Sequence, residues 1–521
     1  MRATPRRAAA ALAAAALATP LLLASASPVT AHRHDPAGRA AGEAAELSEE
    51  LVRESSARDA FEHLREFQRT ADRAGGNRAA GTPGHAASAA YVHRLLKKAG
   101  YRVWYQDFEF VYTETRAEKL SVVSPAPRDV AIAAMTYTKS TPAGGITAKL
   151  AAAPVDADGT HGCEPGDFAP GAFTGNIALV KRGGCAFGVK QENAAAAGAV
   201  GAIVYNNVEG ALSGTLGDPA ADGIPIGGIT LAAGEKLAAD LARGPVKVAF
   251  EIRQHQEERS TRNVIAETPH GDAAGTVMLG AHLDSVTASP GINDNGSGSA
   301  GLLEVALELA ETRERPANKV RFAWWGAEEN GLLGSEHYVA HLGDSGRKEI
   351  RLYLNFDMIA SPNHGLFVYD GDDSDGVGAP AGPAGSAQLE RDIGEFLDRT
   401  GTPYEGTDFT GRSDYGPFVE AGIPSGGTFT GAEEIKTAPQ AEKFGGTAGV
   451  AYDACYHAAC DDLDNVGMRA FDVNIDVIAH AVGTYAQDLG SLREPVTTVP
   501  TGGGTGSGGG LHDGHDREVT E

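Results

Sequence analysis

The chain is poor in sulfur, in basic side chains and in long apolar runs. It has four cysteines and five methionines in 521 residues. Its 44 Lys and Arg face 69 Asp and Glu, so the formal net charge is -25. This excess of negative charge argues against nucleic-acid binding and is more typical of plain solubility. Beyond the N-terminus no apolar run is long enough to predict a membrane span, so we expect no membrane anchor.

The N-terminus has the pattern of a secretory signal peptide. Basic residues at Arg2 and Arg6-Arg7 lead into the apolar run Ala8–Leu23, which small residues follow. Cleavage fits best after Ala31, with Ala26 as the second choice, so residues 1–31 are predicted to be removed. The paired arginines match a twin-arginine signal only weakly. We therefore expect a secreted, extracellular protein.

Composition divides the rest of the chain, which is too long for one ordinary domain. Residues 32–55 show no core pattern and predict a pro-segment or a loose N-terminal region. Residues 117–255, rich in Ala, Gly and Val, predict a smaller domain inserted into a larger one, which comprises 56–116 and 256–494. Residues 495–521 predict a Gly-rich linker and a disordered acidic tail.

The second half of the chain alternates strands and helices. Apolar runs at Val277–Leu283, Val320–Trp325 and Leu352–Phe356 predict strands. Apolar residues at helical spacing between 300 and 310 predict a helix between the first two. This alternation favours an α/β fold with a mainly parallel sheet covered by helices on both faces.

The four cysteines fall into two local pairs. Because exported proteins fold in an oxidising environment, where cysteines form disulfides, we predict the disulfides Cys163–Cys185 and Cys455–Cys460. The second would stiffen a short loop that contains His457.

Polar side chains follow each of the three apolar strands. His282 ends the first run, Glu328-Glu329 follow the second, and Asp357 follows the third. Each alone has an ordinary interpretation: a hydrogen-bonded histidine, a solvated turn, or a turn residue such as Asp294. Their coincidence at successive strand ends, where open α/β sheets bind ligands, favours a metal site.

The spacing around His282 adds to this interpretation. Asp284 lies two residues later, on the same face of an extended chain, and is expected to accept a hydrogen bond from the imidazole. Nitrogen and oxygen ligands without sulfur suit a catalytic zinc site better than a structural one.

Together these residues resemble the metallopeptidase family M28, the aminopeptidase Y family, and most of all its secreted bacterial zinc aminopeptidases. The inserted segment is similar to a protease-associated (PA) domain, through residues 178–187 and Asn193-Ala194. The matching motifs are His282-x-Asp284, Asp294, Glu328-Glu329, Asp357, His457, Gly75-Gly76-Asn77-Arg78, Gly411-Arg412-Ser413-Asp414 and Asp453-x-Cys455-Tyr456-His457-x-x-Cys460-Asp461.

The resemblance implies a mixed, mostly parallel eight-stranded sheet flanked by helices, and two zinc ions per chain. One ion is expected on His282 and Asp357, the other on Glu329 and His457, with Asp294 bridging them.

The resemblance also implies roles in catalysis. Glu328 is expected to be the general base, with Asp284 orienting His282 and Tyr456 steadying the tetrahedral intermediate. Arg412 is expected to contact the substrate backbone or the product carboxylate, and Phe429 to line an apolar side-chain pocket. Asp472 and Asp476 match positions that bind calcium in some relatives, although a solvated helix face explains them as well.

These features predict a monomeric aminopeptidase that acts on peptides with a free N-terminus and favours apolar first residues. Three alternatives remain. They are a carboxypeptidase acting on acidic C-termini, a glutaminyl cyclase with one zinc, and a binding protein whose peptidase domain is inactive.

Overall fold

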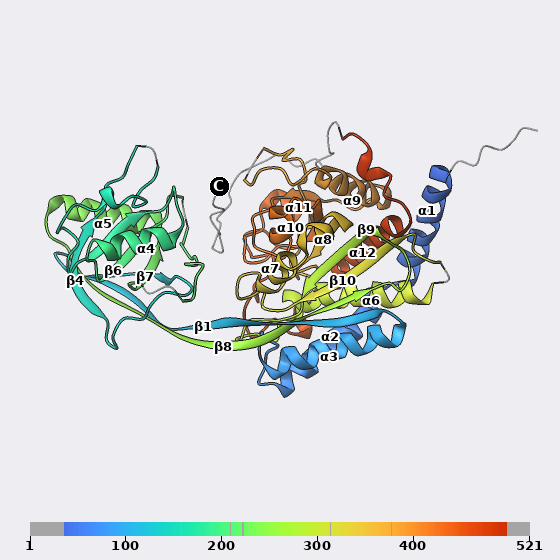
Figure 1. The fold of residues 1–521 in the computed structure, drawn as a ribbon, viewed down its shortest axis with the longest axis horizontal. Coiled ribbons are helices and arrows are strands. Elements are labelled where there is room, and N and C mark those ends of the chain that lie inside the picture. Colours follow the sequence, from blue (N-terminus) through green and yellow to red (C-terminus); the bar gives the residue numbers. More distant parts are fainter. Residues whose placement is uncertain are drawn as a thin grey trace, which may run out of the picture.

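The computed structural model describes residues 36–496, apart from 158, 209, 221–222, 313 and 377. The predicted signal peptide, and the tail beyond residue 496, lie outside these residues. Two lobes are visible in Figure 1, and two long strands, β1 (Arg102–Ser124) and β8 (Lys247–Glu267), run from one to the other. Within the described range, no helix combines the length and apolar character needed to cross a bilayer.

The remaining elements are α-helices, shorter strands and short helical turns. The α-helices are α1 (Pro36–Glu54), α2 (Ala57–Arg73), α3 (Pro83–Ala99), α4 (Phe187–Ala196), α5 (Leu231–Arg243), α6 (Gly298–Glu311), α7 (Leu333–Ala340), α8 (Gly343–Glu349), α9 (Ser386–Thr400), α10 (Gly416–Glu420), α11 (Ala438–Phe444) and α12 (Met468–Gln487). The other strands are β2 (Arg128–Val130), β3 (Ala133–Ala134), β4 (Ile146–Ala152), β5 (Ile177–Lys181), β6 (Gly201–Tyr205), β7 (Ile226–Ile229), β9 (Asp272–His282), β10 (Asn318–Trp325), β11 (Ile350–Phe356), β12 (Phe367–Tyr369), β13 (Glu405–Thr407) and β14 (Ser425–Phe429). Short helical turns are η1 (Pro165–Asp167), η2 (Ile292–Ser297), η3 (Leu463–Asn465) and η4 (Ser491–Arg493).

The larger lobe is built on a mixed sheet. Among the described residues its strand order is β13-β12-β14-β11-β9-β10-β8-β1. The four central strands β14, β11, β9 and β10 are mutually parallel, whereas β8 and β1 each run antiparallel to their neighbours. The eight-stranded mixed α/β sheet expected from the resemblance is confirmed.

Both faces of this sheet are covered because its central strands are apolar on both sides. Trp324 and Trp325, consecutive on β10, point to opposite faces and are both fully buried. Trp324 joins a core shared with α1, α2, α3, α6, α9 and α12. Trp325 joins a second core with side chains from α7 and α10.

The segment 32–55, for which the sequence predicts a pro-segment or a loose N-terminal region, contains an ordered helix, α1, in the part that the structure describes. α1 packs against α12, and its residues Leu47 and Leu51 are fully buried in the main core. Burial of each leucine stabilises the fold by roughly 1.5–3 kcal/mol. Ser48 also hydrogen-bonds His480 at 2.7 Å. The apolar positions of α1 are few and lie among alanines and glutamates, which concealed the pattern.

The smaller lobe has its own cores, and its strands continue the sheet from the far part of β8, where β4 pairs antiparallel with β8. Its strands run in the order β4-β5-β6-β7-β3, parallel from β4 to β7, and the disulfide Cys163–Cys185 lies in this lobe. Alternate residues of β5 enter two separate apolar clusters, one on each face. The predicted boundaries near 116 and 255 fall inside β1 and β8, so continuous strands join the lobes.

Candidate metal centre

The candidate ligands gather at the carboxyl edge of the central sheet. His282 is the last residue of β9, Asp357 directly follows β11, and Glu328 lies three residues after β10. Because these strands are parallel neighbours, their carboxyl ends meet at one edge. Asp294 reaches the same place from η2, and His457 from the loop before η3.

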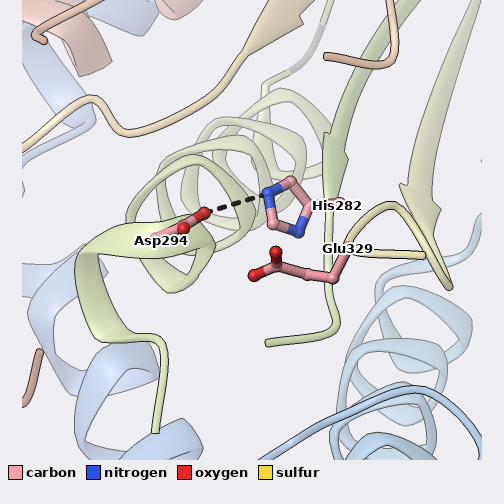
Figure 2. Close-up of side chains that lie close together, drawn as sticks. All are labelled: His282, Asp294 and Glu329. Carbon is pink, nitrogen blue, oxygen red and sulfur yellow. Dashed lines mark ion pairs between the residues drawn. The ribbon is translucent and has the colours of Figure 1, made fainter. Parts of the chain in front are cut away.

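The Asp294 carboxylate lies between two imidazoles. Its Oδ1 is 3.2 Å from Nε2 of His282, and its Oδ2 is 3.2 Å from Nε2 of His457. His282 Nε2 is also 3.3 Å from Asp357 Oδ1, and His457 Nε2 is 3.0 Å from Glu329 Oε2. Figure 2 shows the His282, Asp294 and Glu329 side chains converging. The five predicted ligands thus form two half-clusters that share Asp294.

The consecutive residues Glu328 and Glu329 face different parts of this cluster. Glu329 lies against His457, whereas Glu328 Oε2 is 4.0 Å from Nε2 of His282. Burial raises the pKa of Glu328 well above its usual range, although the nearby His282 opposes the shift.

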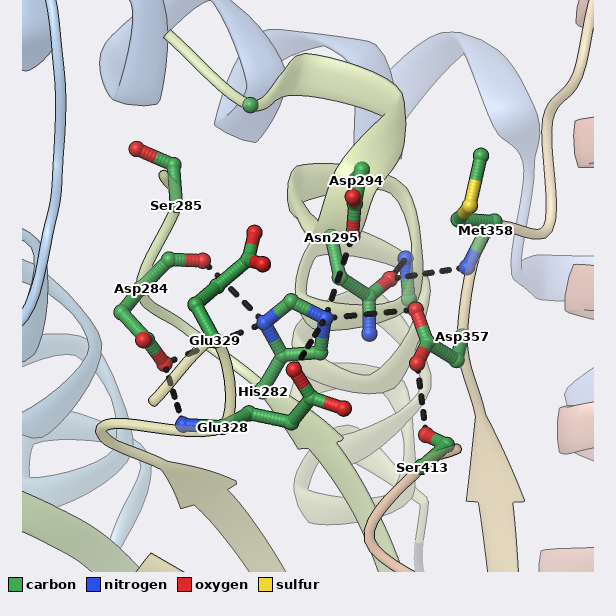
Figure 3. A network of polar contacts seen from close by, with 12 residues as sticks. His282, Asp284, Ser285, Asp294, Asn295, Glu328, Glu329, Asp357, Met358 and Ser413 are labelled. Atoms are coloured by element: carbon green, nitrogen blue, oxygen red, sulfur yellow. Dashed lines mark hydrogen bonds and ion pairs between the residues drawn. The ribbon is translucent and has the colours of Figure 1, made fainter. Parts of the chain in front are cut away.

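The structure differs in detail from the predicted contact between His282 and Asp284. Nδ1 of His282 donates to the main-chain carbonyl of Asp284 at 3.1 Å, while the Asp284 carboxylate lies farther away, at 3.8 Å. That carboxylate accepts the main-chain N–H of Glu328 at 3.2 Å. Burial raises the pKa of Asp284 to about 6. Asp284 therefore ties the β9 end to the Glu328 loop as well as orienting His282 (Figure 3).

The Asp294 loop is held by side chains whose role the sequence did not indicate. Asp461 accepts the main-chain N–H groups of Asn293 and Asp294, at 2.7 and 3.0 Å. The Asn293 amide donates to Asp453 at 2.7 Å. Both aspartates flank His457 in the sequence, so one network fixes the bridging carboxylate and the histidine loop together.

Arg78 holds the other side of the same loop. Its guanidinium is fully buried and donates to the carbonyls of Leu283, Pro290 and Gly291. Burial lowers its pKa to about 10. The motif Gly75-Gly76-Asn77-Arg78 was visible in the sequence, but its contact with carbonyls about 205 to 213 residues later was not.

Asp357 is fixed from the opposite side. The Ser413 hydroxyl donates to Asp357 Oδ2 at 2.5 Å, and the amide of Asn355 donates to Ser413 at 2.8 Å. The other carboxylate oxygen of Asp357, Oδ1, faces His282 and has no hydrogen-bond donor in the described part of the chain.

This donor set fits divalent cations. Asp294, Glu328, Glu329 and Asp357 are buried together, and within residues 36–496 no Lys or Arg ion pair neutralises them. Burial alone would lower the pKa of His457, yet Glu329 and Asp294 raise it to about 11. The cluster thus strongly favours positive charge. Buried carboxylate oxygens without a hydrogen-bond donor, including Glu329 Oε1 and Asp357 Oδ1, suit metal coordination.

Beside the cluster, Tyr456 and Arg412 lie next to each other. The Tyr456 ring stacks on His457 with centroids 3.8 Å apart, and its hydroxyl is 3.3 Å from Nη2 of Arg412. Nη1 of Arg412 lies 2.9 Å from Glu433 and 3.4 Å from Glu434. The predicted disulfide Cys455–Cys460 closes the loop that carries Tyr456 and His457.

A cavity of about 390 Å³ opens onto the cluster. Its lining includes the five candidate ligands with Glu328, Arg412, Tyr456 and Phe429. A cavity of this size suits a small ligand or part of a peptide.

Asp472 and Asp476 lie away from this centre, on α12. Asp472 accepts the main-chain N–H of Ala57 at 3.2 Å and so caps the start of α2. Neither residue belongs to the clusters of at least three potential ligands found in the described chain. Calcium binding here stays a prediction.

Comparisons with known proteins agree with the fold. Residues 263–482 match Peptidase family M28, and residues 146–237 match the PA domain. The chain is 45% identical to a probable lipoprotein aminopeptidase, LpqL, of Mycobacterium tuberculosis, over 86% of this chain and 88% of that one. It is also 45% identical to leucine aminopeptidase 2 of Arthroderma otae, over 79% and 80% of the two chains. A zinc aminopeptidase from Bacillus subtilis, BSAP, has a similar structure, with a TM-score of 0.55 and 28% identity over 82% of this chain and 94% of that one.

The fold and the site define a hydrolase that acts on peptides. The chain belongs to peptidase family M28 and contains an inserted PA domain.

Proposed function

We propose that the protein is a secreted aminopeptidase that uses two zinc ions to remove apolar residues from the N-termini of peptides. The observation that carries the proposal is the Asp294 carboxylate, which turns one oxygen toward His282 and the other toward His457. The names of the relatives, aminopeptidase and leucine aminopeptidase, support the same direction of cleavage.

The two half-clusters support an assignment of the ligands. His282 and Asp357 would hold one ion, Glu329 and His457 the other, and Asp294 would belong to both. When bound, zinc supplies Lewis-acid chemistry: it lowers the pKa of a water molecule and polarises the scissile carbonyl.

The remaining side chains carry the proton and the developing charge. Glu328 is the general base that takes a proton from the attacking water and delivers it to the leaving amine. The hydroxyl of Tyr456 donates to the carbonyl oxygen of the substrate as negative charge develops there. Arg412 holds that hydroxyl in place.

The charge of the cavity supports an aminopeptidase over a carboxypeptidase. Among its described lining residues Arg412 is the only Arg or Lys, and it is already paired with Glu433 and Glu434. An acidic C-terminal residue would require further cations. Carboxylates such as Glu328 and Asp357 instead suit a free α-ammonium group, and Phe429 suits an apolar first side chain. Two complete half-clusters likewise argue against a one-zinc cyclase.

Two measurements test the proposal. Elemental analysis should give near two zinc equivalents per chain, and chelation should abolish activity that added zinc restores. Leucine p-nitroanilide should be cleaved, and its N-acetyl form should react slower by orders of magnitude. One zinc equivalent with full activity would contradict the two-metal assignment. Equal turnover of the acetylated substrate, or preferential release of C-terminal glutamate, would contradict the aminopeptidase assignment.

A further inference from the structure

The smaller lobe stands beyond the sheet edge that carries the metal centre. β1 runs antiparallel to β8, and β8 runs antiparallel to β10, so β1 points the same way as β10 and continues past its carboxyl end. Trp104 of β1 and Ala323 of β10 both pair with Ile265. Thr113 lies nine residues farther along β1, roughly 30 Å at the usual rise of an extended strand. β1 and β8 therefore carry the smaller lobe to the side on which substrate must enter (Figure 1).

One cavity connects the candidate metal centre with this lobe. Besides the metal-centre residues, its lining includes Thr113, Thr115 and Gln254 from β1 and β8, and Thr136, Tyr137 and Thr215 from the smaller lobe. We call these six residues the far wall.

The far wall is polar but carries no charge. Its side chains are four threonines, one glutamine and one tyrosine, all of which form hydrogen bonds without selecting for charge. The hydroxyl of Thr113 is enclosed and has no hydrogen-bond partner in the described part of the chain. Such a group is costly to bury unless a ligand satisfies it.

The loop of the far wall is held firmly. The N–H of Thr136 donates to the carbonyl of Gly214 at 2.8 Å, and its carbonyl accepts from the N–H of Leu216 at 3.1 Å. The next residue, Tyr137, has a φ of 68°, which residues other than glycine rarely adopt. Surrounding contacts must maintain that conformation, so Tyr137 has a fixed place beside the cavity.

We propose that the far wall binds the downstream part of the peptide substrate, the part that leaves after cleavage, mainly through its main chain. Uncharged hydroxyl and amide groups recognise peptide N–H and C=O groups whatever the side chains. The enzyme therefore prefers longer peptides and tolerates many downstream sequences. This inference rests on the proposed aminopeptidase function.

The test compares kcat/KM for leucine p-nitroanilide, Leu-Ala and leucyl-oligoalanines of up to six residues. In the wild type kcat/KM should rise with length. The ratio of hexapeptide to nitroanilide activity should fall roughly three- to tenfold in Thr113→Val and in Tyr137→Ala, the effect of losing one hydrogen bond or ring contact. Thr147→Val, on the exposed side of β4 and outside the cavity, is the matched control and should keep the wild-type ratio.

Each outcome decides between the two proposals. A ratio unchanged in both far-wall variants, or lowered equally in Thr147→Val, would overturn the far wall while leaving the aminopeptidase function intact. Tyr137→Ala keeps the test valid if Thr113→Val does not fold. Failure of the zinc-loaded wild type to cleave any leucyl substrate would overturn the proposed function and this inference with it.

Discussion

The guanidinium of Arg412 lies between Glu433, at 2.9 Å from Nη1, and the hydroxyl of Tyr456, at 3.3 Å from Nη2. This geometry favours a role for Arg412 in positioning Tyr456, whereas the family resemblance implies a contact with substrate. The two roles affect different kinetic constants.

We expect Arg412→Ala to lower kcat about tenfold with a smaller change in KM, because Tyr456 loses the group that orients it. A double-mutant cycle with Tyr456→Phe tests the coupling. If Arg412 acts through Tyr456, the two losses should be far from additive. Additive losses, or an effect confined to KM, would show that Arg412 binds the substrate itself.

Replacing Glu328 or Glu329 by glutamine should distinguish the general base from the metal ligand. Glu328→Gln removes the base but keeps its size, so kcat should fall by ~10²–10⁴-fold while both zinc equivalents remain. Glu329→Gln should lower the zinc content, since Glu329 faces His457 at 3.0 Å. Zinc analysis and kinetics on the same preparations decide between them. The reverse pattern would mean that base and ligand are exchanged.

The two disulfides should differ in their effect on the centre. Replacing Cys455 and Cys460 by serine frees the loop of His457, and we expect weaker zinc binding and at least tenfold lower activity. The loss of stability should be modest, about 2 kcal/mol for so short a ring. The matched control replaces Cys163 and Cys185 in the smaller lobe, and should keep zinc affinity. Equal zinc affinity in both double variants would contradict a role for the ring in presenting His457.

Asp476 should make stability depend on pH. Burial, with Asp472 beside it, raises its pKa to about 7, above the value near 4 of an unfolded aspartate. The folded state therefore loses stability as pH rises from about 4 to 7, and the cost is fully present above 7. Asp476→Asn should raise Tm by ~1–3 °C at pH 8 and leave it unchanged near pH 4.

Added calcium tests the alternative that Asp472 and Asp476 form a calcium site. If Asp472 and Asp476 bind calcium, the ion should raise Tm of the wild type at pH 8 but not that of Asp476→Asn. No change in either protein would leave Asp472 with its observed role as the cap of α2.

The sequence predicted the elements whose signals are local. His282 and Asp357 directly follow apolar strands, so their meeting at one sheet edge follows from parallel pairing alone. α6 also lies close to the helix predicted between 300 and 310, because its apolar residues recur at helical spacing.

Long-range contacts carried no such signal. Asp461 binds main-chain N–H groups 167 and 168 residues away, and Arg78 binds carbonyls farther still. Nothing near either residue in sequence indicates its partner, because the partner is main chain and has no side-chain identity. The same reason explains why the carboxylate of Asp284 was expected to accept the hydrogen bond from His282, whereas the main-chain carbonyl of Asp284 accepts it.

The paired strands β1 and β8 also explain how the larger fold accommodates an insertion. Thr113 and Gln256 are neighbours in the ladder, so the chain departs and returns at almost the same point. To the larger lobe, the inserted lobe is equivalent to the tip of a hairpin. Joining these two positions by an Asn-Gly turn would give an ordinary hairpin that leaves the host pairing unaltered. The junction is thus a natural place at which one lobe can be exchanged for another without redesigning the catalytic core.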